Sequence, residues 1–144
     1  AGYTREQVFI ANVVKCRPPG NRDPLPDELA ACARFLDRQI ETINPHVIVT
    51  LGRFSMAKFL PNARISEVHA KTYWVHDRLI VPMYHPAAAL HQPSLKSTLI
   101  NDFRTLPAAI ASARAAAKRQ PAQTRTPAEG LKEIEEKPEQ LSLF

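Results

Sequence analysis

Short apolar runs and amphipathic stretches alternate along the first 119 residues of the chain. Apolar runs bounded by turn residues predict strands, and apolar residues recurring at three- and four-residue spacing predict helices. One such stripe begins near Pro26 and reaches Ile43, where Asn44-Pro45 ends it. The predicted elements, in chain order, are a strand at 7–15, a helix at 26–43, a strand at 47–51, a helix at 54–60, strands at 72–75 and 79–83, a helical turn at 87–90 and a helix from 94 to about 118.

This order of strands and helices predicts an α/β domain that lacks its beginning. We assign residues 1–119 to that domain, residues 120–139 to a linker rich in proline and charge, and residues 140–144 to a separate terminal peptide. The first residues include no initiator methionine and lead directly into a predicted strand. We therefore expect an N-terminally truncated chain.

Composition narrows the classes of function. A hydrophobic content of 44% in 144 residues is enough for one core. The net charge of +5 makes a polyanion such as nucleic acid a reasonable partner. The chain has no long apolar run and no signal-peptide pattern, so we expect a cytoplasmic protein with no membrane partner. Its two cysteines then favour a metal site or a reduced structural role over a disulfide.

Asn12 ends the first predicted strand, at a position where open α/β sheets bind ligands. Its amide offers an acceptor and two donors, which match the adjacent N–H and carbonyl on the pairing edge of uracil. Cytosine reverses that order and would leave buried polar groups unpaired. A residue that only caps or turns the end of a strand fits this position as well.

Cys16 and Cys32 flank a proline-rich loop and are candidate ligands of a metal centre. Two thiolates do not complete a four-ligand site, so further ligands must come from elsewhere. Two buried free cysteines are the alternative, because Cys32 also lies on the apolar stripe of the helix. Lys15, Arg17 and Arg22 in the same stretch are candidate phosphate contacts, although a solvated basic loop would look the same.

His85-Pro86 directly follows a predicted strand. A histidine there can donate a hydrogen bond to a developing anion, and the apolar Leu90 beyond it can fill the space that a base leaves in a duplex. A structural histidine is the alternative.

The turn at Gly52-Arg53 can offer backbone amides to a phosphate or be only a tight turn. The remaining histidines, which we assign to surface or packing, are His46, His69, His76 and His91.

The terminal peptide resembles the short linear motif by which bacterial repair and replication proteins dock on the sliding clamp. Its candidate clamp-binding residues are Gln140, Leu141, Leu143 and Phe144. The glutamine would enter a polar site, and the leucine and phenylalanine would fill an apolar pocket. The preceding linker would supply the reach that tethering needs.

Together these motifs resemble the family 4 uracil-DNA glycosylases, the iron–sulfur branch of that superfamily. The resemblance covers roughly residues 1–103. Its most specific parts are Asn12-Val13-Val14-Lys15-Cys16-Arg17-Pro18-Pro19, Asn21-Arg22, Cys32, Val47 to Arg53 and Tyr84-His85-Pro86-Ala87-Ala88. It implies a three-layer α/β/α fold with a central, mainly parallel four-stranded sheet.

The resemblance also implies roles for individual residues. Asn12 would read the uracil edge, and His85 would stabilise the uracil anion as the glycosidic bond breaks. Cys16 and Cys32 would hold half of a structural [4Fe-4S] cluster. The loop at His85-Pro86 would contact DNA at the minor groove. Lys15, Arg17, Arg22, Arg53 and Leu90 complete the predicted DNA contacts.

Two departures from the family pattern affect these expectations. In the family, a Gly-Glu-Ala-Pro-Gly motif that helps position water and two further cluster cysteines precede the point at which this chain starts. We therefore expect the chain by itself to be a poor catalyst. His69-Ala70 also stands where the family pattern has His-Gly.

The sequence thus predicts a monomeric uracil-DNA glycosylase of base excision repair, which flips uracil out of DNA, hydrolyses its N-glycosidic bond and leaves an abasic site. A non-catalytic DNA-binding module tethered to the clamp is one alternative. A structural protein in which two chains share a metal through their cysteines is another.

Overall fold

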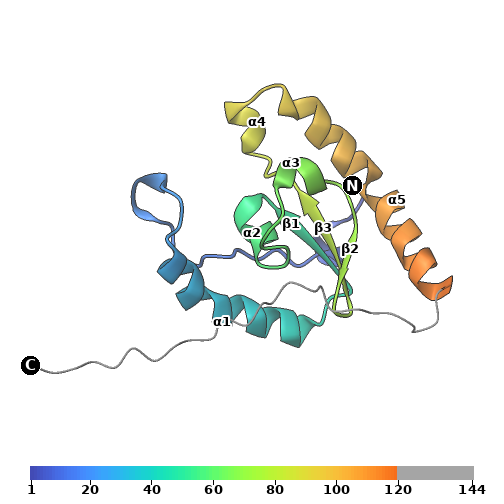
Figure 1. Cartoon of the computed structure of the whole chain (residues 1–144), viewed down its shortest axis with the longest axis horizontal. Coiled ribbons are helices and arrows are strands. Elements are labelled where there is room, and N and C mark those ends of the chain that lie inside the picture. The colour runs from blue at the N-terminus through green and yellow to red at the C-terminus, as the bar shows by residue number, and fades with distance from the viewer. Residues whose placement is uncertain (120–144) are drawn as a thin grey trace, which may run out of the picture.

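A three-stranded sheet lies at the centre of the structure, a computed structural model that describes residues 1–119 (Figure 1). Its elements, in chain order, are 3-10 helices at Arg5–Gln7 and Pro19–Asn21, α1 (Pro26–Ile43), β1 (Val47–Leu51), α2 (Arg53–Ala57), α3 (Ile65–Val68), β2 (Tyr73–Val75), β3 (Arg78–Met83), α4 (Ala88–His91) and α5 (Leu95–Arg119). No helix among these residues is long and apolar enough to cross a membrane. The predicted linker and clamp-binding peptide lie outside the described residues.

The sheet has the strand order β1-β3-β2. β1 runs parallel to β3, with Val47 opposite Leu79 and Leu51 opposite Met83. β2 pairs antiparallel with β3 through a tight turn in which His76 has a φ of 53°. β3 is the middle strand and is covered on both faces, which fits its continuous apolar run from Leu79 to Met83.

The main apolar core lies between the sheet and α5. It joins residues of β3 that are fully buried to the inner face of the helix, and its buried members are Leu79, Val81, Met83, Leu106 and Ile110. Figure 1 shows the sheet between α5 on one side and α1 and α2 on the other. The α/β class expected from the order of elements is therefore confirmed.

α1 begins and ends at the residues that the sequence predicts. Pro26 occupies its first turn, where a missing N–H is harmless. The carboxylate of Glu28 accepts the backbone N–H of Leu25 at 2.8 Å, which caps the start of the helix. Asn44 adopts the left-handed conformation with a φ of 46° and ends it. Local chemistry thus accounts for both ends of α1.

The prediction of a strand at 7–15 is wrong. A 3-10 helix occupies Arg5–Gln7, and the segment that follows is not paired with any strand of the described structure. Val8, Phe9 and Ile10 remain 39%, 60% and 64% exposed. An apolar, extended segment becomes a strand only through hydrogen bonds to a neighbouring strand, and here none is supplied.

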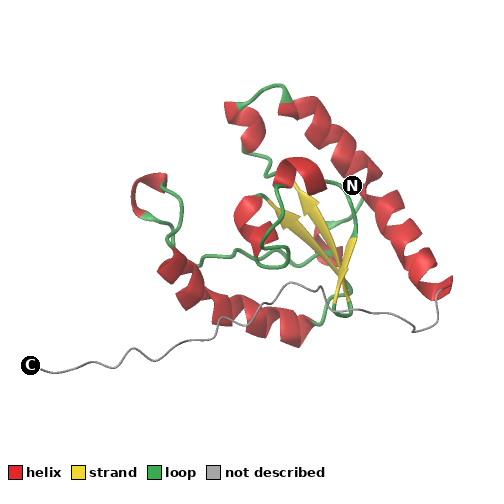
Figure 2. Ribbon diagram, viewed as in Figure 1, coloured by secondary structure: helices red, strands yellow, loops and turns green. Residues whose placement is uncertain are grey.

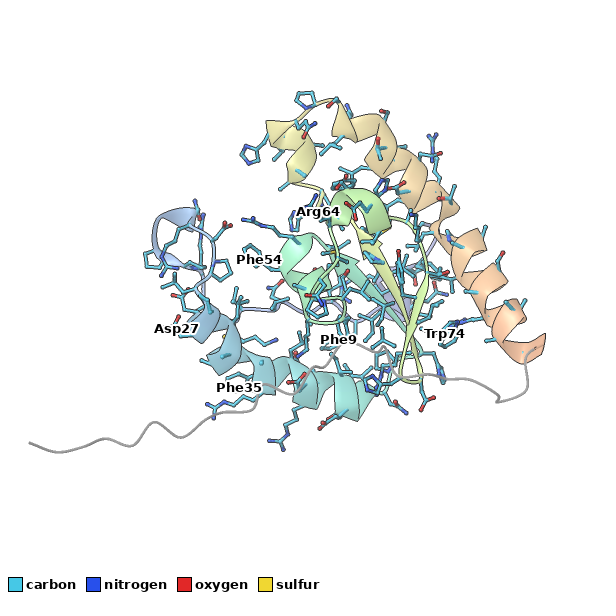
Figure 3. The ribbon with its side chains drawn as sticks, in the orientation of Figure 1. Phe9, Asp27, Phe35, Phe54, Arg64 and Trp74 are labelled. Atoms are coloured by element: carbon cyan, nitrogen blue, oxygen red, sulfur yellow. The ribbon has the colours of Figure 1, made fainter. Side chains whose placement is uncertain are left out.

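The described residues do not confirm the four-stranded, mainly parallel sheet that the resemblance implies. The sheet has three strands, of which one pair is parallel and the other antiparallel. Phe9 lines a hollow of about 590 Å³ against α1, together with Phe35 and Ile43. Figure 3 labels the side chains of Phe9 and Phe35.

The helices after β1 differ in detail from the prediction. α2 ends at Ala57 rather than at residue 60, because the last predicted residues form a tighter turn back to Met56. α3 carries no clear periodicity in the sequence and was not predicted. The predicted turn and long helix near the end of the domain are confirmed as α4 and α5.

Candidate active site at the carboxyl ends of the parallel strands

The carboxyl ends of β1 and β3 lie at one edge of the sheet, as Figure 2 shows by their arrowheads. The backbone N–H of Gly52, just after β1, donates to the carbonyl of Met83, the last residue of β3, at 2.8 Å. This bond continues the pairing of the two strands by one residue. It brings the turn after β1 next to the segment that starts at Tyr84.

Gly52 is required at this turn for two reasons. Its φ of 84° and ψ of 174° lie in a region that only glycine adopts without strain. A Cβ atom built on Gly52 would also lie only 3.1 Å from the Cβ of His85. The close approach of this backbone therefore bounds one side of His85.

His85 is exposed to solvent, and its ring is oriented by its own backbone turn. Its Nδ1 accepts the backbone N–H of Ala87 at 3.1 Å, and its carbonyl accepts the N–H of Ala88 at 2.9 Å. An imidazole that accepts at Nδ1 carries its proton at Nε2 when it is neutral. In that tautomer the ring presents its Nε2–H as a donor beyond the carboxyl end of β3.

Asn12 is held from the side of α1. The ammonium group of Lys15 donates to the carbonyl of Asn12 and to Oε1 of Gln39, each at 2.9 Å. The Asn12 residue itself is exposed. Among the hydrogen bonds of residues 1–119, none joins Asn12 to His85. The two predicted functional residues are therefore held by different parts of the structure.

Cys16 and Cys32 line the same cavity, of about 200 Å³, and both thiols are free. The backbone N–H of Lys15 donates to Sγ of Cys32 at 3.3 Å, as amides do toward the sulfur atoms of metal–thiolate centres. Within residues 1–119 no group of three or more metal-binding side chains comes together. Two thiols supply only half of the donors that a four-thiolate site needs, so metal binding by Cys16 and Cys32 stays a prediction.

The predicted DNA-binding cations all have partners within the protein. Arg17 donates to Asn21 at 2.5 Å. Arg22 forms an ion pair with Glu28 at 2.8 Å. Arg53 pairs with Asp23 and lies 4.7 Å from the ring of Phe54. The last pair joins the proline-rich loop to the turn that holds Gly52. These residues stabilise the loop, and their contact with DNA stays a prediction.

The ion pair between Arg22 and Glu28 shifts the pKa of both side chains. The hydrogen bond from Arg22, with help from the N–H of Leu25, lowers the pKa of Glu28 to about 2. The same hydrogen bond raises the pKa of Arg22. The pair thus ties the loop that carries Cys16 to the first turn of α1.

Leu90 lies on α4, five residues beyond His85, and is 81% exposed. Its neighbour in the predicted site, Pro86, is exposed as well. An apolar side chain so fully in solvent contributes little to the stability of the fold. Insertion of Leu90 into DNA stays a prediction.

One interaction near this edge escaped the sequence analysis. His69, which we assigned to surface or packing, bonds through Nδ1 to the carboxylate of Asp102 on α5 at 2.7 Å. Its ring also lies 4.8 Å from that of Tyr84, the residue before His85. The two partners of the hydrogen bond are 33 positions apart, and no local pattern links them.

Comparison with known proteins identifies the family to which the chain belongs. A family model described as "Uracil DNA glycosylase superfamily" matches residues 1–105, which include every predicted site residue outside the tail. The chain belongs to the uracil-DNA glycosylase superfamily. The identification covers Asn12, both cysteines and His85 in one continuous match.

Relatives within the superfamily are similar over most of the chain. A type-4 uracil-DNA glycosylase of Saccharolobus solfataricus is 46% identical over 120 residues, covering 77% of this chain and 56% of the relative. One of Sulfurisphaera tokodaii is 49% identical over 114 residues, covering 73% and 52%. One of Thermotoga maritima is 43% identical over 108 residues, covering 72% and 56%. The chain thus spans about half the length of the relatives it matches.

Proposed function

We propose that the protein containing this chain is a uracil-DNA glycosylase of base excision repair. The observation that carries the proposal is the orientation of His85. It follows a parallel strand, contacts Gly52, and has its Nδ1 occupied by the N–H of Ala87. The similarity to type-4 uracil-DNA glycosylases over most of the chain supports the same activity.

The proposed mechanism follows from which bond is broken, the N-glycosidic bond. When the bond between the sugar carbon C1′ and the uracil nitrogen N1 breaks, its electron pair stays with the base, which becomes an anion. The Nε2–H of His85 donates a hydrogen bond to the uracil oxygen on which that charge accumulates. A donor that is already oriented needs no rearrangement when the charge develops, so it stabilises the transition state more than the ground state. Water adds to C1′ and loses a proton, and the uracil anion gains one in exchange with the solvent, which leaves an abasic sugar and free uracil.

Base selection is assigned to Asn12. Its side-chain amide would pair with the adjacent N–H and carbonyl of uracil and leave buried polar groups unpaired against cytosine. The hydrogen bond between Lys15 and the carbonyl of Asn12 supports this assignment, because it holds the backbone that carries the amide.

Access to the base requires that it leave the duplex. Extrusion costs a few kcal/mol of stacking and pairing, which an apolar side chain inserted into the vacated space offsets in part. Leu90 is suited to that insertion because it is apolar, almost fully exposed and close to His85 in the chain. Pro86 would stiffen the same loop against the DNA backbone.

Cys16 and Cys32 would hold half of a [4Fe-4S] cluster. Bound there, the cluster would supply a structural link between the proline-rich loop and α1 and no redox chemistry. The shared cavity and the N–H directed at Cys32 support that assignment. Asn12 lies four residues before Cys16, so the cluster would also help to hold the base-reading residue in place.

The test is uracil excision by the full-length protein, measured in single turnover on DNA that contains one uracil. We expect His85→Ala to lower the rate by about 10²–10³-fold, the usual effect of removing one such donor. His91→Ala, an exposed histidine on the adjacent α4, serves as the matched control and should leave the rate unchanged. Asn12→Asp should weaken the preference for uracil. DNA binding by the wild-type protein with no abasic product would overturn the proposal and favour the non-catalytic DNA-binding module.

A further inference from the structure

The strongest unassigned feature is a chain of three side chains that begins in the core and ends beside His85. Asp102 of α5 is 4% exposed, and its Oδ2 lies 2.7 Å from Nδ1 of His69. The ring of His69 lies 4.8 Å from that of Tyr84 at an interplanar angle of 42°. Tyr84 is followed directly by His85. We propose that Asp102 and His69 are positioning residues that fix Tyr84 and, through it, the donor geometry of His85.

The hydrogen bond between His69 and Asp102 satisfies a carboxylate that the fold buries. A carboxylate removed from water must have a partner, and His69 supplies it. Nδ1 of His69 is the donor, because an ionised carboxylate only accepts. The bond therefore sets the orientation of the His69 ring and with it the face presented to Tyr84.

The segment that carries His69 is also anchored to β3. The N–H of His69 bonds to the carbonyl of Ile65 at 3.0 Å, and the N–H of Ala70 bonds to the carbonyl of Pro82 at 2.8 Å. Pro82 lies on β3, two residues before Tyr84, which follows the strand. Neither the ring of His69 nor the backbone around it can shift without disturbing the end of β3.

His85 is thus constrained through two neighbouring positions. Gly52 approaches the side chain of His85 itself, and the Asp102–His69 pair acts on Tyr84, the residue before His85. An error of about 1 Å in the position of a catalytic donor can reduce a rate by about a hundredfold. The contacts that hold Tyr84 and His85 should therefore raise the rate of excision in addition to stabilising the fold.

The inference rests on the proposed function where it concerns rate, so its test has two independent readouts. The first is the rate of uracil excision in single turnover, measured beside the Kd for DNA carrying a non-hydrolysable uracil nucleotide. The second is the ¹⁵N NMR spectrum of the His85 imidazole in full-length protein without DNA, which reports its tautomer directly.

We expect Asp102→Ala to lower the rate about tenfold to a hundredfold while the Kd changes less than about twofold. Asp102→Asn keeps an oxygen that accepts from His69 and should restore most of the rate. Tyr84→Leu leaves the Asp102–His69 bond intact and should reproduce the loss. Glu67→Gln, the same kind of exchange in the exposed Arg64–Glu67 pair two residues from His69, is the control and should change nothing.

The NMR readout separates the two proposals. In wild type we expect a single His85 tautomer protonated at Nε2, and in Asp102→Ala and Tyr84→Leu a mixture of tautomers. That shift in a protein that excises no uracil would support the positioning role and refute the proposed function. An unchanged His85 spectrum in both variants, or an excision rate in Asp102→Ala equal to wild type, would overturn the positioning role.

Discussion

At the scale of single residues, the candidate site depends on backbone groups as much as on side chains. The tautomer of His85 depends directly on one N–H, that of Ala87, and its position depends in part on the absence of a side chain at Gly52. Histidine alone does not define a donor, since either ring nitrogen can carry the proton. The local turn after β3 decides which nitrogen faces a ligand.

Gly52→Ala should therefore impair both stability and excision. The new Cβ would be 3.1 Å from the Cβ of His85, and the backbone would keep a φ of 84° that alanine adopts only with strain. We expect a loss of about 1–3 kcal/mol in the free energy of unfolding, measured by urea titration, and a lower single-turnover rate.

The variant Gly20→Ala separates the effect of backbone strain from the effect of the contact with His85. Gly20 also has a positive φ, of 62°, but nothing lies within 4 Å of an added Cβ. This variant should lose about 1 kcal/mol of stability and keep its rate of excision. Equal effects of the two substitutions on excision would mean that the contact with His85 is unimportant.

At the scale of elements, α1 is the support on which the proline-rich loop is built. Its first turn holds Arg22 through Glu28, its middle carries Cys32, and its Gln39 side chain accepts from Lys15. The loop has no regular structure of its own beyond one short 3-10 helix at Pro19–Asn21. Its conformation is therefore set by contacts with the helix.

The link between Glu28 and Arg22 should be visible in the dependence of stability on pH. The pKa of Glu28 is lowered from 4.5 to about 2, so the folded state favours the ionised form. This contribution to stability is fully present above about pH 4.5 and is lost as the pH falls toward 2. In Glu28→Gln the free energy of unfolding should fall less steeply than in wild type between pH 5 and pH 2.

The control for this measurement is Glu41→Gln, the same exchange at the far end of α1. It should leave the wild-type pH dependence in place. Identical pH profiles for wild type and Glu28→Gln would show that the pair does not stabilise the folded state.

Both cysteines should be needed for the same metal centre, because they line one cavity. We expect Cys16→Ala and Cys32→Ala each to lower bound iron and acid-labile sulfide in the full-length protein, measured chemically and by visible absorbance. Each should also lower the melting temperature, because loop and helix lose their link. Unchanged iron in either variant would assign that cysteine to packing.

At the scale of the whole molecule, the described residues form a domain whose site lies at one edge of the sheet, with α1 and α5 on opposite sides of it (Figure 1). The terminal peptide lies outside the described residues. We propose that residues 140–144 bind the bacterial sliding clamp and that residues 120–139 tether the domain to it.

Removal of residues 140–144 from the full-length protein should abolish binding to purified clamp, measured by surface plasmon resonance. Excision of uracil from short DNA without the clamp should stay unchanged, because tethering raises only the local concentration. The matched control replaces Ser142 by Ala, which leaves the apolar residues of the peptide in place. Full clamp binding by the shortened protein would refute the motif.

The sequence by itself determined the features that depend on local chemistry. The bounds of α1 follow from Pro26 and Asn44, and the continuous apolar run at 79–83 predicts a buried strand whose end carries His85. The order of elements was enough to predict the α/β class, and the motifs around Asn12, Cys16 and His85 were enough to predict the family.

Tertiary structure alone decided the features that need a partner distant in the chain. Residues 8–12 have the apolar character of a strand but are not one in the described structure, because pairing depends on a neighbour and not on composition. The approach of Gly52 to His85 and the pairing of His69 with Asp102 join positions 33 residues apart in each case. Such contacts leave no local pattern, since they arise only when the folded chain brings separate elements together.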